Sequence, residues 1–127
     1  MTPVFLSLDE VLEIHENQLA LYGGRSGILN LALLESALAQ PQASFGGQFL
    51  LADLFEMAAA YLFHIVQNHP FHDGNKRVGA VAAITFLLTN ASDVSLTNEE
   101  LETLVLDTAT GTMTREQIAA LLRAHAA

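Results

Sequence analysis

Residues 78–88 read Val-Gly-Ala-Val-Ala-Ala-Ile-Thr-Phe-Leu-Leu, the most apolar stretch of the chain. Apolar side chains fall on nearly every side of the helix that this stretch predicts, from Asn75 or Lys76 to about Asn90. A helix without a polar face has to be surrounded by protein, so we expect it to be the central helix of the fold. With 11 residues, the stretch is too short to span a bilayer.

Five further helices are predicted around this central one. Four of them begin at a capping box or a capping side chain before an apolar periodic run, and the one from about Ala52 is predicted from its apolar pattern. They run from the capping box Ser7–Glu10 to Gly23, from Asn30 to just before Pro41, from about Ala52 to Asn68, from the capping box Thr97–Glu100, and from the capping box Thr114–Gln117. Residues 4–6 and 94–96 could be short strands, but two such pieces make no stable sheet. We therefore expect an all-α fold, with residues 1–127 forming a single compact domain of about six helices.

Composition excludes several classes of function. The 127 residues carry a net charge of −9 with only 5 Lys and Arg, too few cations for a surface that follows nucleic-acid phosphates. The absence of cysteine excludes a disulfide scaffold, a thiolate zinc site and a cysteine nucleophile. Apolar residues make up 51% of the chain, which indicates a full core or an apolar surface patch for a partner. The start does not read as a signal peptide, so we expect a soluble, cytoplasmic protein without membrane contact.

One segment concentrates the reactive side chains. Residues 69–77 read His-Pro-Phe-His-Asp-Gly-Asn-Lys-Arg and lie in the predicted break before the central helix. Imidazole titrates nearest to neutral pH of all side chains, so His69 is a candidate general base. Asp73 offers the hard carboxylate oxygens that Mg²⁺ uses beside nucleotide phosphates. Phe71, an apolar residue in a polar loop, is expected to insert into the core and anchor the loop.

The end of this segment predicts an anion site. Gly74 lets the backbone approach an anion closely, and the free amides of Gly74, Asn75 and Lys76 would form a nest strengthened by the helix dipole. Lys76 and Arg77 add two cations, of which Arg77 offers a planar fork suited to phosphate oxygens. A base, a metal ligand, an anion nest and two cations favour transfer of a phosphorus-centred group to a hydroxyl.

Other interpretations of the same residues stay open. Histidine, aspartate, glycine and asparagine are frequent in loops for turn and capping reasons alone, so the segment can be purely structural. His64, His69, His72 and Asp73 could gather around zinc, although the spacing of His64 and His69 suits one helical face poorly.

Two histidines and one loop outside the segment receive different assignments. His15 and His125 lie on apolar helix faces and are expected to be half-buried packing residues. The loop Gln40–Phe49 carries Phe45 and Phe49 on either side of two glycines, so it is a candidate edge for docking a target protein.

Residues 69–77 resemble the signature of the Fic/Doc superfamily, His-x-Phe-x-Asp/Glu-Gly-Asn-Gly/Lys-Arg, at every constrained position. Within it the chain is most similar to the death-on-curing branch, because it is short and carries Lys76 where nucleotidylating relatives usually carry glycine. The similarity includes residues 22–27 (Tyr-Gly-Gly-Arg-Ser-Gly) and 34–38 (Leu-Glu-Ser-Ala-Leu), and covers roughly residues 5–112.

The resemblance implies a set of roles and a reaction. His69 would be the general base for the target hydroxyl, Asp73 would hold the Mg²⁺–phosphate complex, Gly74 and Asn75 would form the anion nest, and Lys76 and Arg77 would bind phosphates. Lys76 would fill the space that the α and β phosphates use in a nucleotidylating enzyme, so that the nucleotide presents its γ-phosphate instead. The implied substrate nucleotide is ATP, used with Mg²⁺.

The resemblance also implies a biological setting. The chain would be a bacterial toxin of a type II toxin–antitoxin system that phosphorylates a Thr or Ser hydroxyl of a translation factor of the elongation factor Tu type. An antitoxin would hold it inactive by laying a helical C-terminal tail across it, in a groove that accounts for the high apolar content. Transfer of AMP or another nucleotidyl group by the same residues, and a non-catalytic toxin that acts by binding, stay open as alternatives.

Overall fold

The computed structural model describes residues 2–127, and within this range six α-helices form most of the regular structure. The helices are α1 (Leu8–Tyr22), α2 (Leu31–Ala39), α3 (Leu54–Asn68), α4 (Asn75–Thr89), α5 (Asn98–Ala109) and α6 (Arg115–Ala124). Between α2 and α3 lie a 3₁₀ turn at Gln40–Gln42 and a small antiparallel hairpin, β1 (Ser44–Phe45) and β2 (Gln48–Phe49). The predicted all-α class is confirmed.

The helices start at the predicted signals. Capping boxes are formed in full at the starts of α1, α5 and α6, around Ser7, Thr97 and Thr114. Asn30 caps α2 by accepting a hydrogen bond from the Leu33 amide. The start of α3 lies slightly later than predicted, because the Asp53 side chain accepts from an amide of the first turn and so marks the helix boundary.

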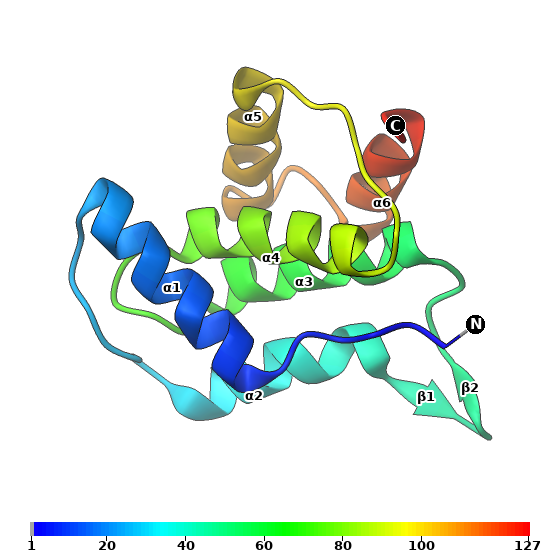
Figure 1. The fold of residues 1–127 in the computed structure, drawn as a ribbon, viewed down its shortest axis with the longest axis horizontal. Coiled ribbons are helices and arrows are strands. Elements are labelled where there is room, and N and C mark those ends of the chain that lie inside the picture. Colours follow the sequence, from blue (N-terminus) through cyan, green and yellow to red (C-terminus); the bar gives the residue numbers. More distant parts are fainter. Residues whose placement is uncertain (1) are drawn as a thin grey trace.

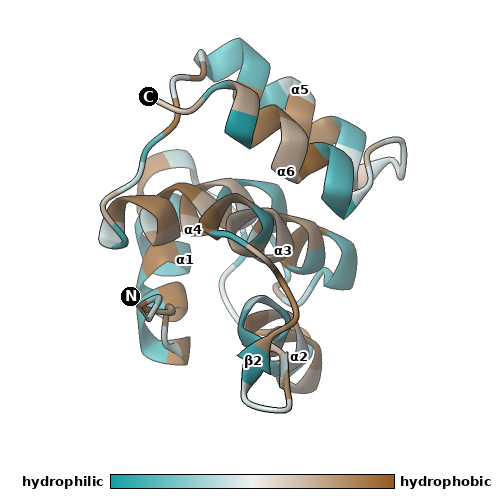
Figure 2. Ribbon diagram, turned by 90° about the vertical axis from the view of Figure 1, so that its right-hand side faces the viewer, coloured by the Kyte–Doolittle hydropathy of each residue, from teal (hydrophilic) through white to brown (hydrophobic). Residues whose placement is uncertain are grey.

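The helices α3 and α4 pack along each other at the centre, and α4 is buried there as its apolar composition predicts. α3 also contacts α2, α5 and α6, whereas α1 packs mainly on α4, on the side away from α5 and α6 (Figure 1). Hydrophobic residues dominate α3 and α4, whereas hydrophilic residues gather on the outer side of α5 (Figure 2). No helix within residues 2–127 has the length and apolar character needed to cross a membrane.

A buried tyrosine ties the N-terminal segment to this core. The side chain of Tyr61 on α3 is fully buried, and its hydroxyl accepts a hydrogen bond of 2.9 Å from the Leu6 amide. Burial raises the pKa of Tyr61 to about 12, which keeps the hydroxyl neutral. The neighbouring Phe5 stacks on Phe86 of α4, with ring centroids 5.7 Å apart.

The hairpin at residues 44–49 was not predicted, and it lies away from the motif. Phe45 is 82% exposed and Phe49 is 40% exposed, as their loop position indicated. However, the hairpin precedes the N-terminal end of α3, whereas His69 follows its C-terminal end (Figure 1). A helix of 15 residues separates its ends by roughly 20 Å. The interpretation of this loop as the docking edge for a target therefore has no geometric support.

The two segments considered as short strands also differ from expectation. Residues 4–6 form no strand, and residue Val94 makes an isolated bridge with Ala126 near the C-terminus. Neither segment forms a sheet, because each lacks a neighbouring strand with which to pair.

A glycine sets the distance between the two central helices. A Cβ atom at Gly79 of α4 would lie 2.9 Å from Cγ2 of Val66 and 3.2 Å from the carbonyl oxygen of Leu62, both on α3. Such distances are shorter than van der Waals contact, so any side chain at this position would push α4 away from α3. The close approach matters for function because both ends of the motif are attached to these two helices.

We expect the substitution Gly79→Ala to destabilise the protein. Overpacking typically costs about 1–3 kcal/mol, of which the better helix propensity of alanine returns about 1 kcal/mol. Denaturant unfolding followed by circular dichroism measures the net change. Thr89→Ala, at the exposed end of the same helix, is the control and should change the free energy of unfolding by less than about 0.5 kcal/mol. An unchanged stability of G79A would mean that separating the helices costs no more than the gain in helix propensity.

Candidate active site

The motif begins with a histidine in an unusual backbone conformation. His69 follows the last residue of α3 with φ 50° and ψ 54°, in the left-handed region, and its amide donates to the Ile65 carbonyl. A left-handed conformation costs a non-glycine residue roughly 1–2 kcal/mol, so the surrounding structure has to hold it in place. The result is an exposed imidazole that stands at the end of a rigid, buried helix.

Asn75 closes the loop that follows. This side chain is buried, its Oδ1 accepts from the Phe71 amide at 2.9 Å, and its Nδ2 donates to the Phe71 carbonyl at 3.0 Å. The same Nδ2 lies 3.1 Å from Nδ1 of His69. Because the Phe71 amide can only donate, the orientation of the Asn75 amide is fixed, and Nδ1 of His69 accepts the hydrogen bond. In the neutral ring the hydrogen therefore sits on Nε2.

Phe71 occupies the position in the core that its anchoring role requires. Its side chain is fully buried and stacks on His15 of α1, with the ring centroids 3.9 Å apart. Its backbone forms an isolated antiparallel bridge with Ile28. The loop is thus held on its buried side by the stack on His15 and on its outer side by the backbone bridge to Ile28.

The start of α4 leaves donors unused. Gly74 is the N-cap residue with φ 84°, and no side chain caps this helix. Within residues 2–127 nothing accepts a hydrogen bond from the amides of Asn75, Lys76 and Arg77. Three unpaired amides at the positive end of a helix dipole make an anion site.

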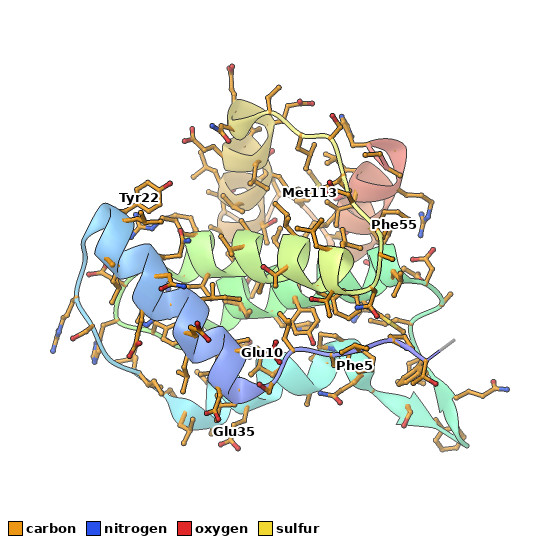
Figure 3. The ribbon with its side chains drawn as sticks, in the orientation of Figure 1. Phe5, Glu10, Tyr22, Glu35, Phe55 and Met113 are labelled. Atoms are coloured by element: carbon orange, nitrogen blue, oxygen red, sulfur yellow. The ribbon has the colours of Figure 1, made fainter. Side chains whose placement is uncertain are left out.

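The two cations of the motif are held differently. Lys76 is exposed, whereas the guanidinium of Arg77 donates to the Gly23 carbonyl at 3.2 Å and lies 5.2 Å from the centre of the Tyr22 ring. Figure 3 shows Tyr22 at the end of α1, beside the start of α4. The Nε atom of Arg77 is buried without a partner among the described residues, so one donor of the guanidinium is left unsatisfied.

These groups share one cavity. A cavity of about 440 Å³ is lined by His69, Asp73, Gly74, Asn75, Lys76 and Arg77, together with Val66 and Gln67 of α3 and Ala109 of α5. All motif residues singled out from the sequence line it, except Phe71, which lies beneath in the core. The cavity therefore combines an imidazole, a carboxylate, free amides and two cations.

The segment that joins α1 to α2, residues 23–30, lies antiparallel to the motif and fixes it. We call it the α1–α2 linker. Hydrogen bonds join the two segments in antiparallel order. At one end the Gly23 carbonyl accepts from the Arg77 side chain, and at the other end the Leu29 and Asn30 amides donate to the Pro70 carbonyl. Between these ends, the Arg25 amide donates to Oδ2 of Asp73 at 2.7 Å, and the His72 amide donates to the Gly27 carbonyl at 3.2 Å.

Asp73 is consequently oriented by this linker. Its Oδ2 accepts from the Arg25 amide, while Oδ1 has no donor within residues 2–127. Mg²⁺ is typically bound through one or two carboxylates plus nucleotide phosphates and water, so one carboxylate with a free oxygen suits it. The neighbouring free amides and cations suit the phosphates, and the residues present therefore fit a Mg²⁺-bound nucleotide.

The sequence did not reveal the part that His15 plays. It is buried rather than half-buried, its Nε2 lies 2.9 Å from the Asp73 carbonyl, and its Cδ2 lies 3.6 Å from where a Cβ atom at Gly74 would be. A carbonyl can only accept, so the ring donates from Nε2. His15 is thus a positioning residue that supports the motif from beneath, although 58 residues separate it from Asp73 in the sequence.

The zinc interpretation is wrong in this structure. Among residues 2–127 no three His, Asp or Glu side chains lie close enough together to hold a metal ion. His64 stays half-buried on α3, where burial and, to a smaller extent, the charge of Arg115 lower its pKa. His72 packs against Gly27 of the linker. His125, the other assigned packing residue, is half-buried and bonds to Glu100 at 3.1 Å.

Comparison with known proteins identifies the family. The sequence profile of the Fic/DOC family matches residues 5–87, which include the whole motif. The chain belongs to the Fic/DOC family. It is 31% identical to "Protein kinase doc" of Escherichia phage P1 over 118 residues, covering 93% of this chain and 92% of that protein. It is 36% identical to "Toxin Doc" of Mycolicibacterium smegmatis (strain ATCC 700084 / mc(2)155) over 110 residues, covering 84% of this chain and 83% of that protein.

The resemblance seen in the motif thus extends over most of the chain. The family profile covers α1 to α4, so it includes the α1–α2 linker and His15 as well as residues 69–77. The three parts that meet at the candidate site therefore all lie in the matched region.

We expect His15→Phe to loosen the motif while keeping the fold. Phenylalanine retains a flat ring against Phe71 but cannot donate to the Asp73 carbonyl, and losing one such hydrogen bond costs about 0.5–1.5 kcal/mol. Amide hydrogen exchange of Phe71 and His72, whose amides donate to Asn75 and Gly27, should accelerate by roughly two- to tenfold. Asn17→Ala, an exposed change on the same helix, should leave it unchanged. Identical exchange in H15F and the parent would show that the bond to Asp73 has no positioning role.

Proposed function

We propose that this protein is a toxin that transfers the γ-phosphoryl group of ATP, with Mg²⁺, to a Thr or Ser hydroxyl of another protein. The observation that supports it best is the cavity where His69 and Asp73 face three free amides and the cations Lys76 and Arg77. Phosphoryl transfer needs little covalent help from the protein, and consists mainly of positioning and charge stabilisation. The names of the two relatives, a protein kinase and a toxin, agree with this proposal.

In the proposed reaction the target hydroxyl oxygen forms a bond to the γ-phosphorus of ATP. The bond from that phosphorus to the bridging oxygen breaks, and ADP leaves with the electron pair. The hydroxyl proton passes to the His69 imidazole. The free amides of residues 75–77 and the cations Lys76 and Arg77 stabilise the charge on the phosphoryl oxygens. When bound, Mg²⁺ would be held by Asp73 and would neutralise part of the phosphate charge.

The hydrogen bond from Asn75 sets a condition on the proton transfer. With the ring hydrogen on Nε2, the outward nitrogen of His69 is a donor and takes no proton. The reacting tautomer needs the hydrogen on Nδ1, which sets a donor against the buried Nδ2 donor of Asn75 and costs about 1–3 kcal/mol. Because His69 is exposed, the tautomers exchange through water. The cost is small beside the 8–23 kcal/mol or so by which enzymes lower barriers.

We further propose that the target is a translation factor of the elongation factor Tu type and that the protein acts in the bacterial cytoplasm. Both proposals rest on the family resemblance described above. Phosphorylation of such a factor would stop translation and growth.

Transfer of label from ATP separates the proposed reaction from its alternatives. With a bacterial lysate and Mg²⁺, γ-labelled ATP should label a target protein, whereas α-labelled ATP should not. His69→Ala should reduce labelling by at least about 10²-fold, the typical contribution of general-base catalysis, while Asn17→Ala should retain it. Label from the α position alone would establish nucleotidyl transfer instead. Toxicity of H69A equal to that of the parent would establish a toxin that acts by binding.

An apolar groove beside the site supports a partner that regulates it. A cavity of about 700 Å³ lies between α1, α4 and α5, and is lined by Tyr22, Val81, Leu101 and Leu106 among others. Leu106 is 54% exposed and Tyr22 is 66% exposed. An amphipathic helix docks by laying apolar residues into such a groove. We propose that the helical C-terminal tail of an antitoxin occupies it as part of a type II toxin–antitoxin system, adjacent to Lys76 and Arg77, which also line the groove.

A charged residue in the groove should abolish neutralisation by the antitoxin. In cells that also produce the protein encoded by the neighbouring reading frame, Leu106→Asp should stay toxic, because a buried unpaired carboxylate opposes docking. Leu88→Asp is a matched control, since Leu88 is 55% exposed but does not line the groove. Growth curves of the two strains give the comparison. Continued neutralisation of L106D would show that the partner binds elsewhere.

A further inference from the structure

The distribution of positive charge singles out one residue of the α1–α2 linker. The chain has 5 Lys and Arg in total. Arg115 lies 3.6 Å from Glu116, and Arg123 lies 2.7 Å from Asp53, so the two cations of α6 are paired with carboxylates. The remaining three, Arg25, Lys76 and Arg77, belong to the linker or to the motif that it contacts.

This small region has the opposite charge to the whole protein. Residues 23–30 and 69–77 contain three cations and a single carboxylate, that of Asp73. The protein as a whole has a net charge of −9. Since like charges close together disfavour the folded state, a positive cluster in an acidic protein indicates a place for an anion.

The backbone holds Arg25 beside the candidate metal ligand. The Arg25 amide donates to Oδ2 of Asp73 at 2.7 Å, within a linker whose other bonds to residues 70–77 fix its register. The linker can approach this closely because position 24 is glycine, where a Cβ atom would lie 3.2 Å from Cβ of Asp73. The origin of the Arg25 side chain is thus fixed next to the site.

The Arg25 side chain itself is uncommitted. The residue is exposed, and none of the ion pairs found within residues 2–127 includes it. Arg77 differs, because its guanidinium is occupied by the Gly23 carbonyl and the Tyr22 ring. Arg25 lies outside the lining of the cavity, beside Asp73, and of these two arginines it has the freer guanidinium for a ligand, with five donors in a planar fork.

We propose that Arg25 is a third phosphate-binding cation of the site, which clasps the triphosphate from the linker side while Lys76 and Arg77 hold it from the start of α4. This inference rests on the proposed use of a nucleoside triphosphate. Because the contact is made to phosphate oxygens, Arg25 contributes to any triphosphate, whichever base it carries. The linker thereby contributes in two ways. The Arg25 backbone amide orients Asp73, and the Arg25 side chain binds the phosphates.

The test is titration of Mg²⁺–ATP and of Mg²⁺–triphosphate into the purified full chain by calorimetry. Arg25→Gln removes the charge but keeps the backbone amide that bonds to Asp73, and should weaken binding of both probes by about tenfold. Arg25→Lys should lose only about threefold, since it keeps the charge but not the fork. Arg123→Gln changes the net charge equally at the far end of the molecule, and should bind as the parent does. Equal melting temperatures of R25Q and the parent verify the fold.

The outcomes distinguish this inference from the proposed function. If the parent binds neither probe, the proposed function fails, and the role of Arg25 fails with it. If the parent binds both and R25Q binds equally well, Arg25 is not a phosphate ligand while the proposed function stands. Equal weakening in R25Q and R123Q, or R25K as weak as R25Q, would likewise overturn a specific contact by the charge of Arg25.

Discussion

The buried amide of Asn75 is the interaction on which the candidate site depends. It pairs with both backbone groups of Phe71 and also reaches the ring of His69, and so closes the turn between α3 and α4. A buried polar side chain is costly unless its hydrogen bonds are made, and here both its oxygen and its nitrogen are engaged. The bonds that satisfy Asn75 are the same bonds that hold His69 in a left-handed conformation and place the first amides of α4 toward the cavity.

Rigid elements support this turn from three directions. The close crossing of α3 and α4 at Gly79 fixes the two ends of the motif, and His15 of α1 supports its middle. The α1–α2 linker covers the outer side with a series of backbone bonds that ends on the carboxylate of Asp73. A site that binds phosphates works mainly by position, so most of the molecule serves to hold a few groups still.

The electrostatic design is equally local. An acidic protein keeps its cations either paired on α6 or collected at one end of α4. At the start of α4, the free amides, the helix dipole and the cationic side chains all contribute positive electrostatic potential. The adjoining groove between α1, α4 and α5 shares Lys76 and Arg77 with the site, so a partner bound there would lie against the phosphate-binding residues.

Local sequence determined much of this protein. Capping residues fixed most of the helix starts, the all-round apolar pattern of residues 78–88 identified a buried central helix, and a contiguous motif placed His69, Asp73 and Arg77 in one short segment, because each of these signals acts over a few residues. Tertiary structure alone decided which distant segments complete the site. The sequence predicted a packing role for His15 and gave Arg25 no role of its own, since nothing in local spacing shows that α1 and its linker lie across the motif. The same limit applies to the loop at residues 40–49: its exposed phenylalanines were visible in the sequence, but only the structure shows that α3 places them at the opposite end of the molecule from the motif.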